Sequence, residues 1–300
     1  MQIALTGGTG VLGSAFVREA TRRGHSLRVL TRLPGRPPIA GVEWVLGALD
    51  DLGSLTALTT GVDAIVHCAY ADLDAAPPPG RSLVEYFAQT NLAGAMRLLE
   101  RCPATRQKQL VFTSSLAVYG PDPRLLPRAR ELPLDEDFPL WPREFYGAHK
   151  AALEKLVIAG SGDLGLNTSV FRIGCLLGDY ADLERDYLAK TVAEAKHGEI
   201  RSQMGAYVIA DVDAASILVD AVGDERMRGK VYNCFHGWWD FSEVTRIAGE
   251  LLGREVRVAA AARAPKPQPE LSNARLCAER APRWTTDLRL RELVGRLLRA

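Results

Sequence analysis

A tyrosine and a lysine four residues apart, in Tyr146-Gly-Ala-His-Lys150, form a pair that could move a proton at neutral pH. In a helix, this spacing places both side chains on one face. A free tyrosine has a pKa of about 10, but a cation within about 4–6 Å favours the phenolate and lowers that pKa. A phenol tuned in this way is a candidate general acid and base for a carbonyl or an alcohol. The alternative is an ordinary pair on a surface helix.

A glycine-rich segment, Thr6-Gly-Gly-Thr-Gly-Val-Leu-Gly13, follows an apolar run and opens a helical pattern. Glycines in this context let the turn tighten, let backbone N–H groups face a pyrophosphate, and let helix pack on strand. Glycine turns without a ligand are also common, but the strand before and the helix after favour a dinucleotide. We therefore expect the cofactor to contact Gly7, Gly10, Val11, Leu12 and Gly13.

The end of the second apolar run indicates which dinucleotide binds. NAD sites usually place an Asp or Glu there to hold the ribose 2′-hydroxyl. This chain has Thr31-Arg32-Leu33-Pro34-Gly35-Arg36, which contains no acid. Arg32 could form charge-assisted bonds to a 2′-phosphate, or it could be a solvated surface arginine. The sequence favours NADP and leaves NAD open.

The elements that must position these residues alternate between short apolar runs and amphipathic stretches. Helical patterns that end at glycine and lead into apolar runs are typical of a parallel sheet flanked by helices. We predict an α/β fold, a doubly wound parallel Rossmann sheet with its ligand crevice at the carboxyl ends of the strands. The predicted strands are 3–6, 27–31, 64–69, 110–114, 167–173 and 229–233, and the predicted helices are 11–23, 54–60, 82–101, 146–159, 242–252 and 288–298.

The later part of the chain leaves the predicted sheet and returns to it. We predict a dinucleotide-binding domain over residues 1–173, with its sheet completed by about 208–236. Residues 174–207 and 237–300 would form a smaller, interleaved substrate-binding lobe. The proline-rich segment 121–142 is typical of a long functional loop, and 259–269 of an Ala/Pro-rich linker.

The amino-acid composition of the chain limits the kinds of partner that we expect it to bind. The formal net charge is +1, with 47% hydrophobic and 24% charged residues. That balance gives no reason to expect nucleic acid or an anionic membrane as a partner. The five cysteines show no metal-binding spacing, and no apolar run approaches the roughly 20 residues that span a bilayer. We expect reduced cysteines, no bound metal, no secretion signal and a cytoplasmic protein.

The chain resembles the extended short-chain dehydrogenase/reductase family, the NAD-dependent epimerase/dehydratase group, over essentially its whole length. TGGTGVLG is similar to that family's TGxxGxxG fingerprint, and YGAHK to its YxxxK pair. FTSSLAVYG at 112–120 resembles the strand that carries the catalytic serine. The resemblance implies Ser115, Tyr146 and Lys150 as catalytic residues, with Tyr146 and Lys150 also touching the cofactor. It further implies cofactor contacts by Leu49, Ala69 and Asn91, and recurrent positions at Arg172 and Asp211.

Departures from the family pattern bear on the reaction and the substrate. Family dehydratases carry an Asp-Glu pair after the catalytic hydroxyl, whereas this chain has Leu116 and Ala117, so 4,6-dehydration is not expected. A frequent adenine-contacting Asp is replaced by Ala48, and Asp50 or the Leu49 backbone could contact the cofactor there instead. Many sugar epimerases have an Asn where this chain has Cys175. The expected substrate contacts are Ser115, Arg172, Cys175 and Trp238.

Three functions follow from these features. The first is an NAD(P)-dependent reductase or dehydrogenase acting on a carbonyl or alcohol, such as a sugar or a natural-product ketone. The second is a nucleotide-sugar 4-epimerase that retains NAD. The third is a non-catalytic dinucleotide-sensing protein, disfavoured because Ser115, Tyr146 and Lys150 are all present. By resemblance to the family, we also expect a homodimer.

Overall fold

The computed structural model describes residues 1–71, 77, 79–104, 109–120, 133–180, 186–201, 205–240, 242–260 and 270–299. Most of the proline-rich loop predicted at 121–142 and most of the linker predicted at 259–269 lie outside these residues. The chain divides into two compact units. Unit 1 comprises 1–121, 139–172 and 215–232, and unit 2 comprises 122–138, 173–214 and 233–300.

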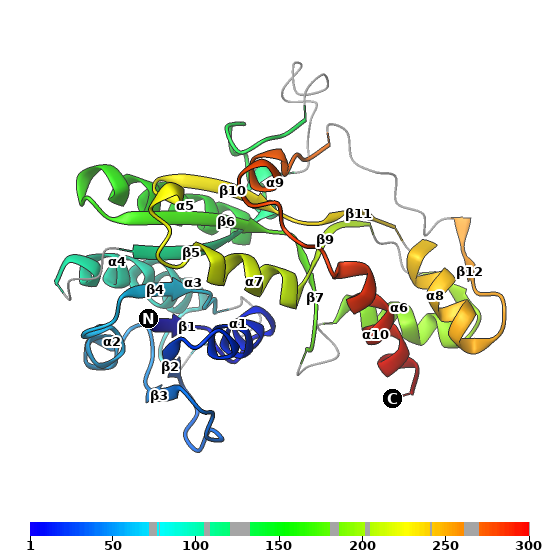
Figure 1. Ribbon diagram of the computed structural model, residues 1–300, viewed down its shortest axis with the longest axis horizontal. Coiled ribbons are helices and arrows are strands. Elements are labelled where there is room, and N and C mark those ends of the chain that lie inside the picture. The colour runs from blue at the N-terminus through cyan, green and yellow to red at the C-terminus, as the bar shows by residue number, and fades with distance from the viewer. Residues whose placement is uncertain are drawn as a thin grey trace. The chain divides into compact units, whose positions relative to one another are not determined.

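Unit 1 is built on a seven-stranded sheet with the order β10-β6-β5-β4-β1-β2-β3 (Figure 1). The pairings of β1 with β2 and β4, of β2 with β3, and of β4 with β5 are parallel. Strand order reverses on either side of β1, as in a doubly wound sheet. The strands are β1 (Gln2–Thr6), β2 (Ser26–Thr31), β3 (Val42–Leu46), β4 (Ala64–His67), β5 (Gln109–Ser115), β6 (Asn167–Ile173) and β10 (Lys230–Cys234).

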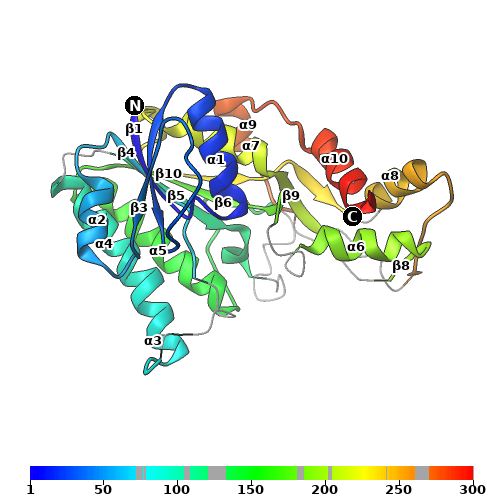
Figure 2. The ribbon, with the colours of Figure 1, turned by 90° about the horizontal axis from the view of Figure 1, so that it is seen from below.

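Helices cover both faces of this sheet. In Figure 2, α1 and α7 lie on one face, and α2, α4 and α5 on the other. The core on the second face joins side chains from β1, β4 and β5 to those of α2, α4 and α5. Strands buried on both faces have nearly continuous apolar sequences, which is why they could be recognised. The helices of unit 1 are α1 (Val11–Arg22), α2 (Leu52–Thr59), α3 (Leu83–Phe87), α4 (Gly94–Ala104), α5 (Phe145–Asp163) and α7 (Asp211–Ala221, shared with unit 2).

The parallel pairing brings chemically useful residues to one edge of the sheet. Thr6 stands opposite His67 at the ends of β1 and β4, and His67 stands opposite Phe112 near the end of β5. The glycine turn, the segment after β4 and Ser115 therefore share the carboxyl edge, where open α/β sheets bind ligands.

Unit 2 has its own small sheets and its own core. One sheet has the order β11-β9-β7 and the other pairs β12 with β8. Helices α6, α8 and α10 pack with them around an apolar cluster that includes Val192, Ile247 and Leu293. The elements are β7 (Cys175–Leu177), α6 (Tyr187–Lys196), β8 (Glu199–Ile200), β9 (Ala206–Ala210), β11 (Gly237–Trp239), α8 (Ser242–Leu252), β12 (Arg257–Val258), α9 (Ala274–Arg280) and α10 (Thr286–Arg299).

The predicted helix over 82–101 is present but is not uniform. It runs as α3, then a π-helical segment over Ala88–Ala93, then α4. π-helical turns inside α-helices are frequent at functional sites. The predicted helix 242–252 has the observed bounds of α8, whereas β3, β9, α6 and α7 were not predicted as separate elements.

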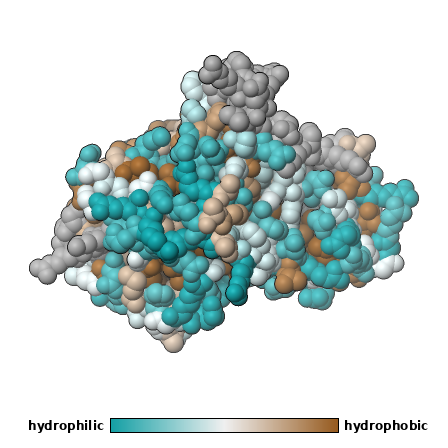
Figure 3. Space-filling view, turned by 45° about the horizontal axis from the view of Figure 1, so that its top comes forward, coloured by the Kyte–Doolittle hydropathy of each residue, from teal (hydrophilic) through white to brown (hydrophobic). Residues whose placement is uncertain are grey.

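The surface seen in Figure 3 is largely hydrophilic, with apolar side chains scattered among polar ones, as is usual for a folded protein in water. Among the helices that the structure describes, none combines the length and the apolar character needed to cross a bilayer.

Candidate active site

Two glycines of the N-terminal turn are required by the fold itself. Gly7 has φ +78°, and a Cβ there would lie 2.6 Å from the backbone nitrogen of Ala69. A Cβ on Gly13 would lie 2.0 Å from the carbonyl oxygen of Gly7. These approaches bring the turn against the segment after β4 and the start of α1 against the turn. Gly10 differs, because a Cβ there would meet only the Gly7 oxygen, at an ordinary 3.5 Å.

The turn borders a cavity of ≈ 520 Å³ in unit 1. Its walls come from the ends of β1, β2 and β4, from the segment after β3, and from the helix that contains the π-helical turn. Of the predicted cofactor residues, Gly7, Gly10, Arg32, Leu49 and Ala69 line it. The other lining residues are Thr9, Leu30, Thr31, Gly47, Ala48, Asp50, Cys68, Tyr70, Ala71, Tyr86 and Thr90.

Features of the cavity fit a phosphate-containing dinucleotide. Helix α1 begins at Val11 with Gly10 as N-cap, and no side chain caps its first N–H groups. Uncapped N–H groups and the helix dipole favour an anion. The Thr90 hydroxyl is buried in the cavity wall with no hydrogen-bond partner among the described residues. A bound dinucleotide would supply hydrogen-bond partners to the first N–H groups of α1 and to the Thr90 hydroxyl.

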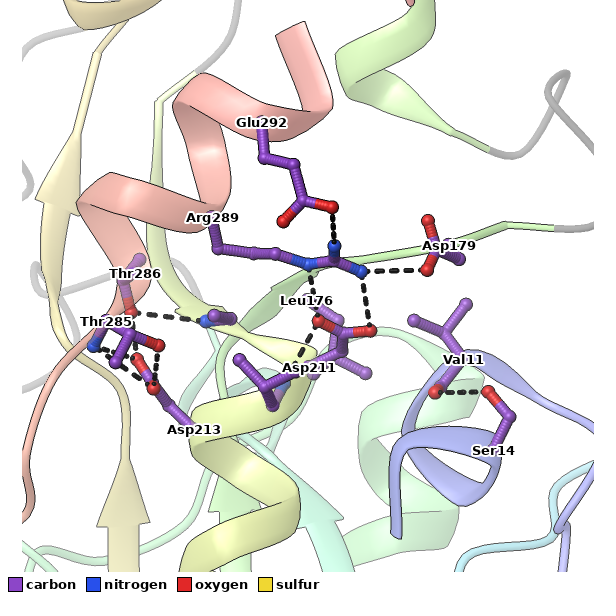
Figure 4. Close-up of polar contacts among 12 residues, drawn as sticks. Val11, Ser14, Leu176, Asp179, Asp211, Asp213, Thr285, Thr286, Arg289 and Glu292 are labelled. Carbon is purple, nitrogen blue, oxygen red and sulfur yellow. Dashed lines mark hydrogen bonds and ion pairs between the residues drawn. The ribbon is translucent and has the colours of Figure 1, made fainter. Parts of the chain in front are cut away.

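Val11 and Leu12 occupy the first turn of α1, outside the cavity wall. The Leu12 side chain is buried, and the Ser14 hydroxyl donates to the Val11 carbonyl (3.0 Å; Figure 4). Any cofactor contact by Leu12 would therefore come from its backbone.

Arg32 lies exposed at the end of β2 and borders the cavity. Its Nη1 donates to the Tyr86 hydroxyl at 3.2 Å, while Arg36 donates from Nε to the Thr31 hydroxyl at 3.3 Å. The carboxylate that does line the cavity, Asp50, is paired with Arg81 at 3.1 Å. The β2 end of the cavity is therefore cationic.

Asn91 does not line the cavity, although the resemblance implied a cofactor contact. Its Oδ1 accepts from the Ala71 N–H at 2.7 Å, and its Nδ2 donates to the Ala71 carbonyl at 2.9 Å. The side chain lies in the π-helical segment and is buried. It thereby fixes the chain after β4, which forms part of the cavity wall.

Lys150 is buried in α5, with 4% of its surface exposed. Its Nζ donates to the Thr113 carbonyl at 2.9 Å, and lies 5.1 and 5.2 Å from the ring centres of Phe112 and Tyr70. Burial lowers the pKa of Lys150 to about 8, partly opposed by Cys68. The ammonium is held by a carbonyl and by aromatic faces, with no carboxylate among these contacts.

Tyr146 lies one helical turn before Lys150, as the spacing predicts. Lys150 Nζ is 5.9 Å from the centre of the Tyr146 ring, and the Tyr70 ring meets Tyr146 edge-on at 4.8 Å. Tyr70 thus contacts both members of the predicted pair.

Ser115 is the last residue of β5 and the N-cap of the short 3₁₀ helix over Leu116–Tyr119. Its hydroxyl accepts from the Ala117 N–H at 3.2 Å. That bond uses an acceptor lone pair and leaves the hydroxyl hydrogen available for donation. Ser115, Tyr146 and Lys150 all belong to unit 1.

Arg172 is 2% exposed and engaged inside unit 1. Its guanidinium forms a two-point ion pair with the buried Glu154, at 3.1 and 2.5 Å, and Nη1 donates to the Tyr119 hydroxyl. These contacts give Arg172 a structural role in joining β6 to α5. The substrate contact predicted for it stays a prediction.

The other predicted substrate residues lie in unit 2. Cys175 begins β7, and burial raises the pKa of its thiol to about 11, so it stays protonated at neutral pH. Trp238 lies in β11, where its ring meets Tyr207 edge-on at 5.3 Å. Their contact with substrate stays a prediction.

Asp211, the other recurrent family position, is fully buried in an ion network of unit 2 (Figure 4). Arg289 of α10 donates to Asp211 from Nε (3.0 Å) and Nη2 (3.2 Å), and to Asp179 at 2.8 Å. Asp213 accepts from the Thr285 N–H at 2.9 Å. These hydrogen bonds hold α10 against the start of α7, so Asp211 has a structural role.

Several cavity residues were not predicted from the sequence. They share a position directly after β4 or on the helix that follows: Cys68, Tyr70, Ala71, Tyr86 and Thr90. The signal that could have found the first three is the rule that ligands bind at the carboxyl ends of parallel strands. The predicted end of this strand, at Ala69, lay two residues beyond the observed end at His67.

The sheet order and the glycine turn define a Rossmann-type α/β protein. A model of the NAD dependent epimerase/dehydratase family matches residues 3–214, so the chain belongs to this family. It is 29% identical over 187 residues to a UDP-glucose 4-epimerase of Lactobacillus helveticus, covering 61% of this chain and 54% of that protein. It is 28% identical over 204 residues to a 2-alkyl-3-oxoalkanoate reductase of Stenotrophomonas maltophilia, covering 67% and 58%.

The chain thus spans little more than half the length of these curated relatives, which are enzymes by name. Among solved structures, a UDP-glucose 4-epimerase of Thermus thermophilus in complex with NAD superposes with a TM-score of 0.76 at 22% identity, covering 99% of each chain. At this identity the likeness concerns the fold alone. The predicted fold class and the resemblance to the family are confirmed.

The glycine turn offers a matched pair of variants. Gly13→Ala should destabilise the protein by about 1–3 kcal/mol, because its Cβ would overlap a backbone oxygen. Gly10→Ala should leave the free energy of unfolding nearly unchanged but weaken dinucleotide binding, since its Cβ would occupy room beside the turn. Chemical unfolding and calorimetric titration with NADPH would separate the two effects. Equal dinucleotide affinity for wild type and Gly10→Ala would contradict the assignment of the turn.

Proposed function

We propose that this protein is an NADP-dependent carbonyl reductase or alcohol dehydrogenase in which Tyr146 is the general acid and base. The observation that carries the proposal is the buried Lys150 ammonium, held by the Thr113 carbonyl one helical turn from Tyr146. A buried cation held by a carbonyl rather than a carboxylate costs free energy, so its position beside a phenol indicates a chemical use. Ser115, at the end of the adjoining strand β5, supplies a hydroxyl near the same edge.

In the reducing direction, the bound nicotinamide would supply a hydride to the carbonyl carbon of the substrate. Ser115 would donate a hydrogen bond to the carbonyl oxygen and orient it. Tyr146 would transfer its phenolic proton to that oxygen as negative charge develops there. Lys150 would then stabilise the phenolate that remains, until a proton returns from solvent. In the oxidising direction, the phenolate would take the proton from the alcohol.

Elimination of water is disfavoured by the residues beside Ser115. A dehydration needs an acid and a base on the carbon skeleton of the substrate, in addition to the hydride exchange. The positions that follow Ser115 are Leu116 and Ala117, and neither side chain can act as a general acid or base. We therefore assign a simple oxidation or reduction.

The preference for NADP rests on charge at the end of β2. Arg32 and Arg36 stand where an NAD site usually has a carboxylate, and Asp50 is already paired with Arg81. We expect Arg32→Ala to weaken NADPH binding by about tenfold or more, a loss of roughly 1.4 kcal/mol, with little change for NADH. Calorimetric titration with both nucleotides measures this. Equal losses of affinity for NADPH and NADH would contradict a contact between Arg32 and the 2′-phosphate.

A second candidate function is a nucleotide-sugar 4-epimerase, favoured by the likeness to a named UDP-glucose 4-epimerase. It would use the same three residues, but would oxidise and re-reduce one substrate on a retained cofactor. A reductase must release its dinucleotide in every cycle. Retention of the cofactor therefore distinguishes the two functions.

The deciding experiment is turnover by the purified protein after removal of bound nucleotide. A reductase should consume NADPH with ketones or keto-sugars, and the rate should depend on Tyr146. Interconversion of UDP-sugars without net NADPH consumption would favour the epimerase. This experiment does not test three other predictions, namely the homodimer, the cytoplasmic location and the domain boundaries.

A further inference from the structure

One threonine in the interior of unit 1 contacts both Lys150, a predicted catalytic residue, and His67, which lies next to the cavity. Thr113 is 5% exposed and precedes Ser115 by two residues on β5. Its carbonyl accepts from Lys150 Nζ at 2.9 Å, and its hydroxyl donates to the His67 carbonyl at 3.1 Å. The first bond links Thr113 to α5 and the second links it to β4.

The β4 side of this connection continues to the glycine turn. His67 Nδ1 lies 2.6 Å from the Thr6 hydroxyl, which also accepts from the Ala69 N–H at 3.3 Å. Burial lowers the pKa of His67 to about 3, so the ring is neutral and can accept from Thr6. A connected series of polar contacts thus runs from Lys150 through Thr113 and His67 to the residues that flank the cavity.

The residue after His67 belongs to the cavity wall. Burial raises the pKa of the Cys68 thiol to about 12, so the thiol stays protonated at neutral pH. Cys68 itself lines the cavity. By donating to the His67 carbonyl, the Thr113 hydroxyl therefore holds the chain directly before Cys68.

We propose that Thr113 is a positioning residue that sets the Lys150 ammonium against Tyr146 and, through His67, holds the cavity wall that receives the dinucleotide. The proposal rests on the proposed function and assigns a residue that the catalytic motifs do not include. Without the hydroxyl, the His67 carbonyl loses the bond from Thr113, and the end of β5 can shift relative to β4. The Thr113 carbonyl would then hold the ammonium less closely.

The test compares Thr113→Val, which keeps the shape and removes the hydroxyl, with Thr113→Ser, which restores it. One readout is the ultraviolet titration of the Tyr146 phenolate, taken as the difference from Tyr146→Phe for each background. The second is the affinity for NADPH by calorimetry. We expect Thr113→Val to raise the pKa of Tyr146 by about one unit and to weaken NADPH about tenfold. Thr113→Ser should restore both to near wild-type values.

Two outcomes would overturn the proposal. A lower melting temperature with unchanged phenolate titration and NADPH affinity would reduce Thr113 to a packing residue. A serine variant that behaves like the valine variant would show that the hydroxyl is not responsible. If Thr113→Val does not fold, Thr113→Ala removes the same hydroxyl without placing a methyl group against a carbonyl. Neither readout requires turnover, so inactivity of the wild type towards ketones would refute the proposed function alone.

Discussion

Replacing Tyr146 with phenylalanine is expected to lower kcat by about 10²–10⁴-fold, the usual contribution of a positioned general acid. The ring contact with Tyr70, at 4.8 Å, would be kept, so the cavity wall should survive. The affinity for NADPH should therefore stay within about threefold, roughly 0.65 kcal/mol, of the wild type. Steady-state kinetics with a ketone substrate and calorimetric titration measure the two quantities.

A matched control is Tyr187→Phe, because Tyr187 is 62% exposed in unit 2. It removes one phenol at a position that is not among the predicted site residues, and should leave kcat unchanged. Unchanged turnover in Tyr146→Phe would rule out the proposed acid. A large loss of NADPH affinity in the same variant would instead show that the phenol mainly serves binding.

Parts of the site that depend on local spacing were predictable from the sequence. A strand, a glycine turn and a helix are contiguous in the chain, so the turn at 6–13 could be recognised without tertiary information. Likewise, two residues four apart on a helix must share a face, and Tyr146 and Lys150 do. The fold class followed from the same local alternation of strands and helices.

What the sequence did not show depends on contacts between residues far apart in the chain. The partners of Arg172 are Glu154 and Tyr119, and no local pattern distinguishes a paired, buried arginine from one that awaits an anionic substrate. Asn91 likewise acts on Ala71, 20 residues earlier. Composition could not show that Tyr70 lies against both Tyr146 and Lys150. These are consequences of strand order and helix packing.

The position of Lys150 has a cost in stability that can be measured. Its pKa in the folded protein is about 8, against 10.5 for an ordinary lysine, because burial disfavours the charged form. Between these two values the unfolded chain binds more protons than the folded one, so stability rises with pH across that window. Below pH 8 the penalty is fully present. A shift of this size corresponds to about 3 kcal/mol.

Lys150→Met should therefore raise the free energy of unfolding at pH 7 by about 2 kcal/mol, while lowering kcat by at least about 100-fold. The gain is smaller than the full penalty because the Thr113 carbonyl loses its donor. As the pH rises through 8 and above 10.5, the burial penalty of the wild type disappears, while its neutral amine can still donate to the Thr113 carbonyl. The difference should therefore fall through zero and end at about 1 kcal/mol in favour of the wild type.

Chemical unfolding at neutral and alkaline pH measures that difference, with Lys155→Met as the control. Lys155 lies on the same helix but is exposed, so its replacement should change stability by less than about 0.5 kcal/mol at any pH. If Lys150→Met destabilises the protein at pH 7, the ammonium is part of what holds the fold together. If it stabilises the protein and abolishes turnover, the chain keeps an unfavourable buried charge because the chemistry at Tyr146 requires it.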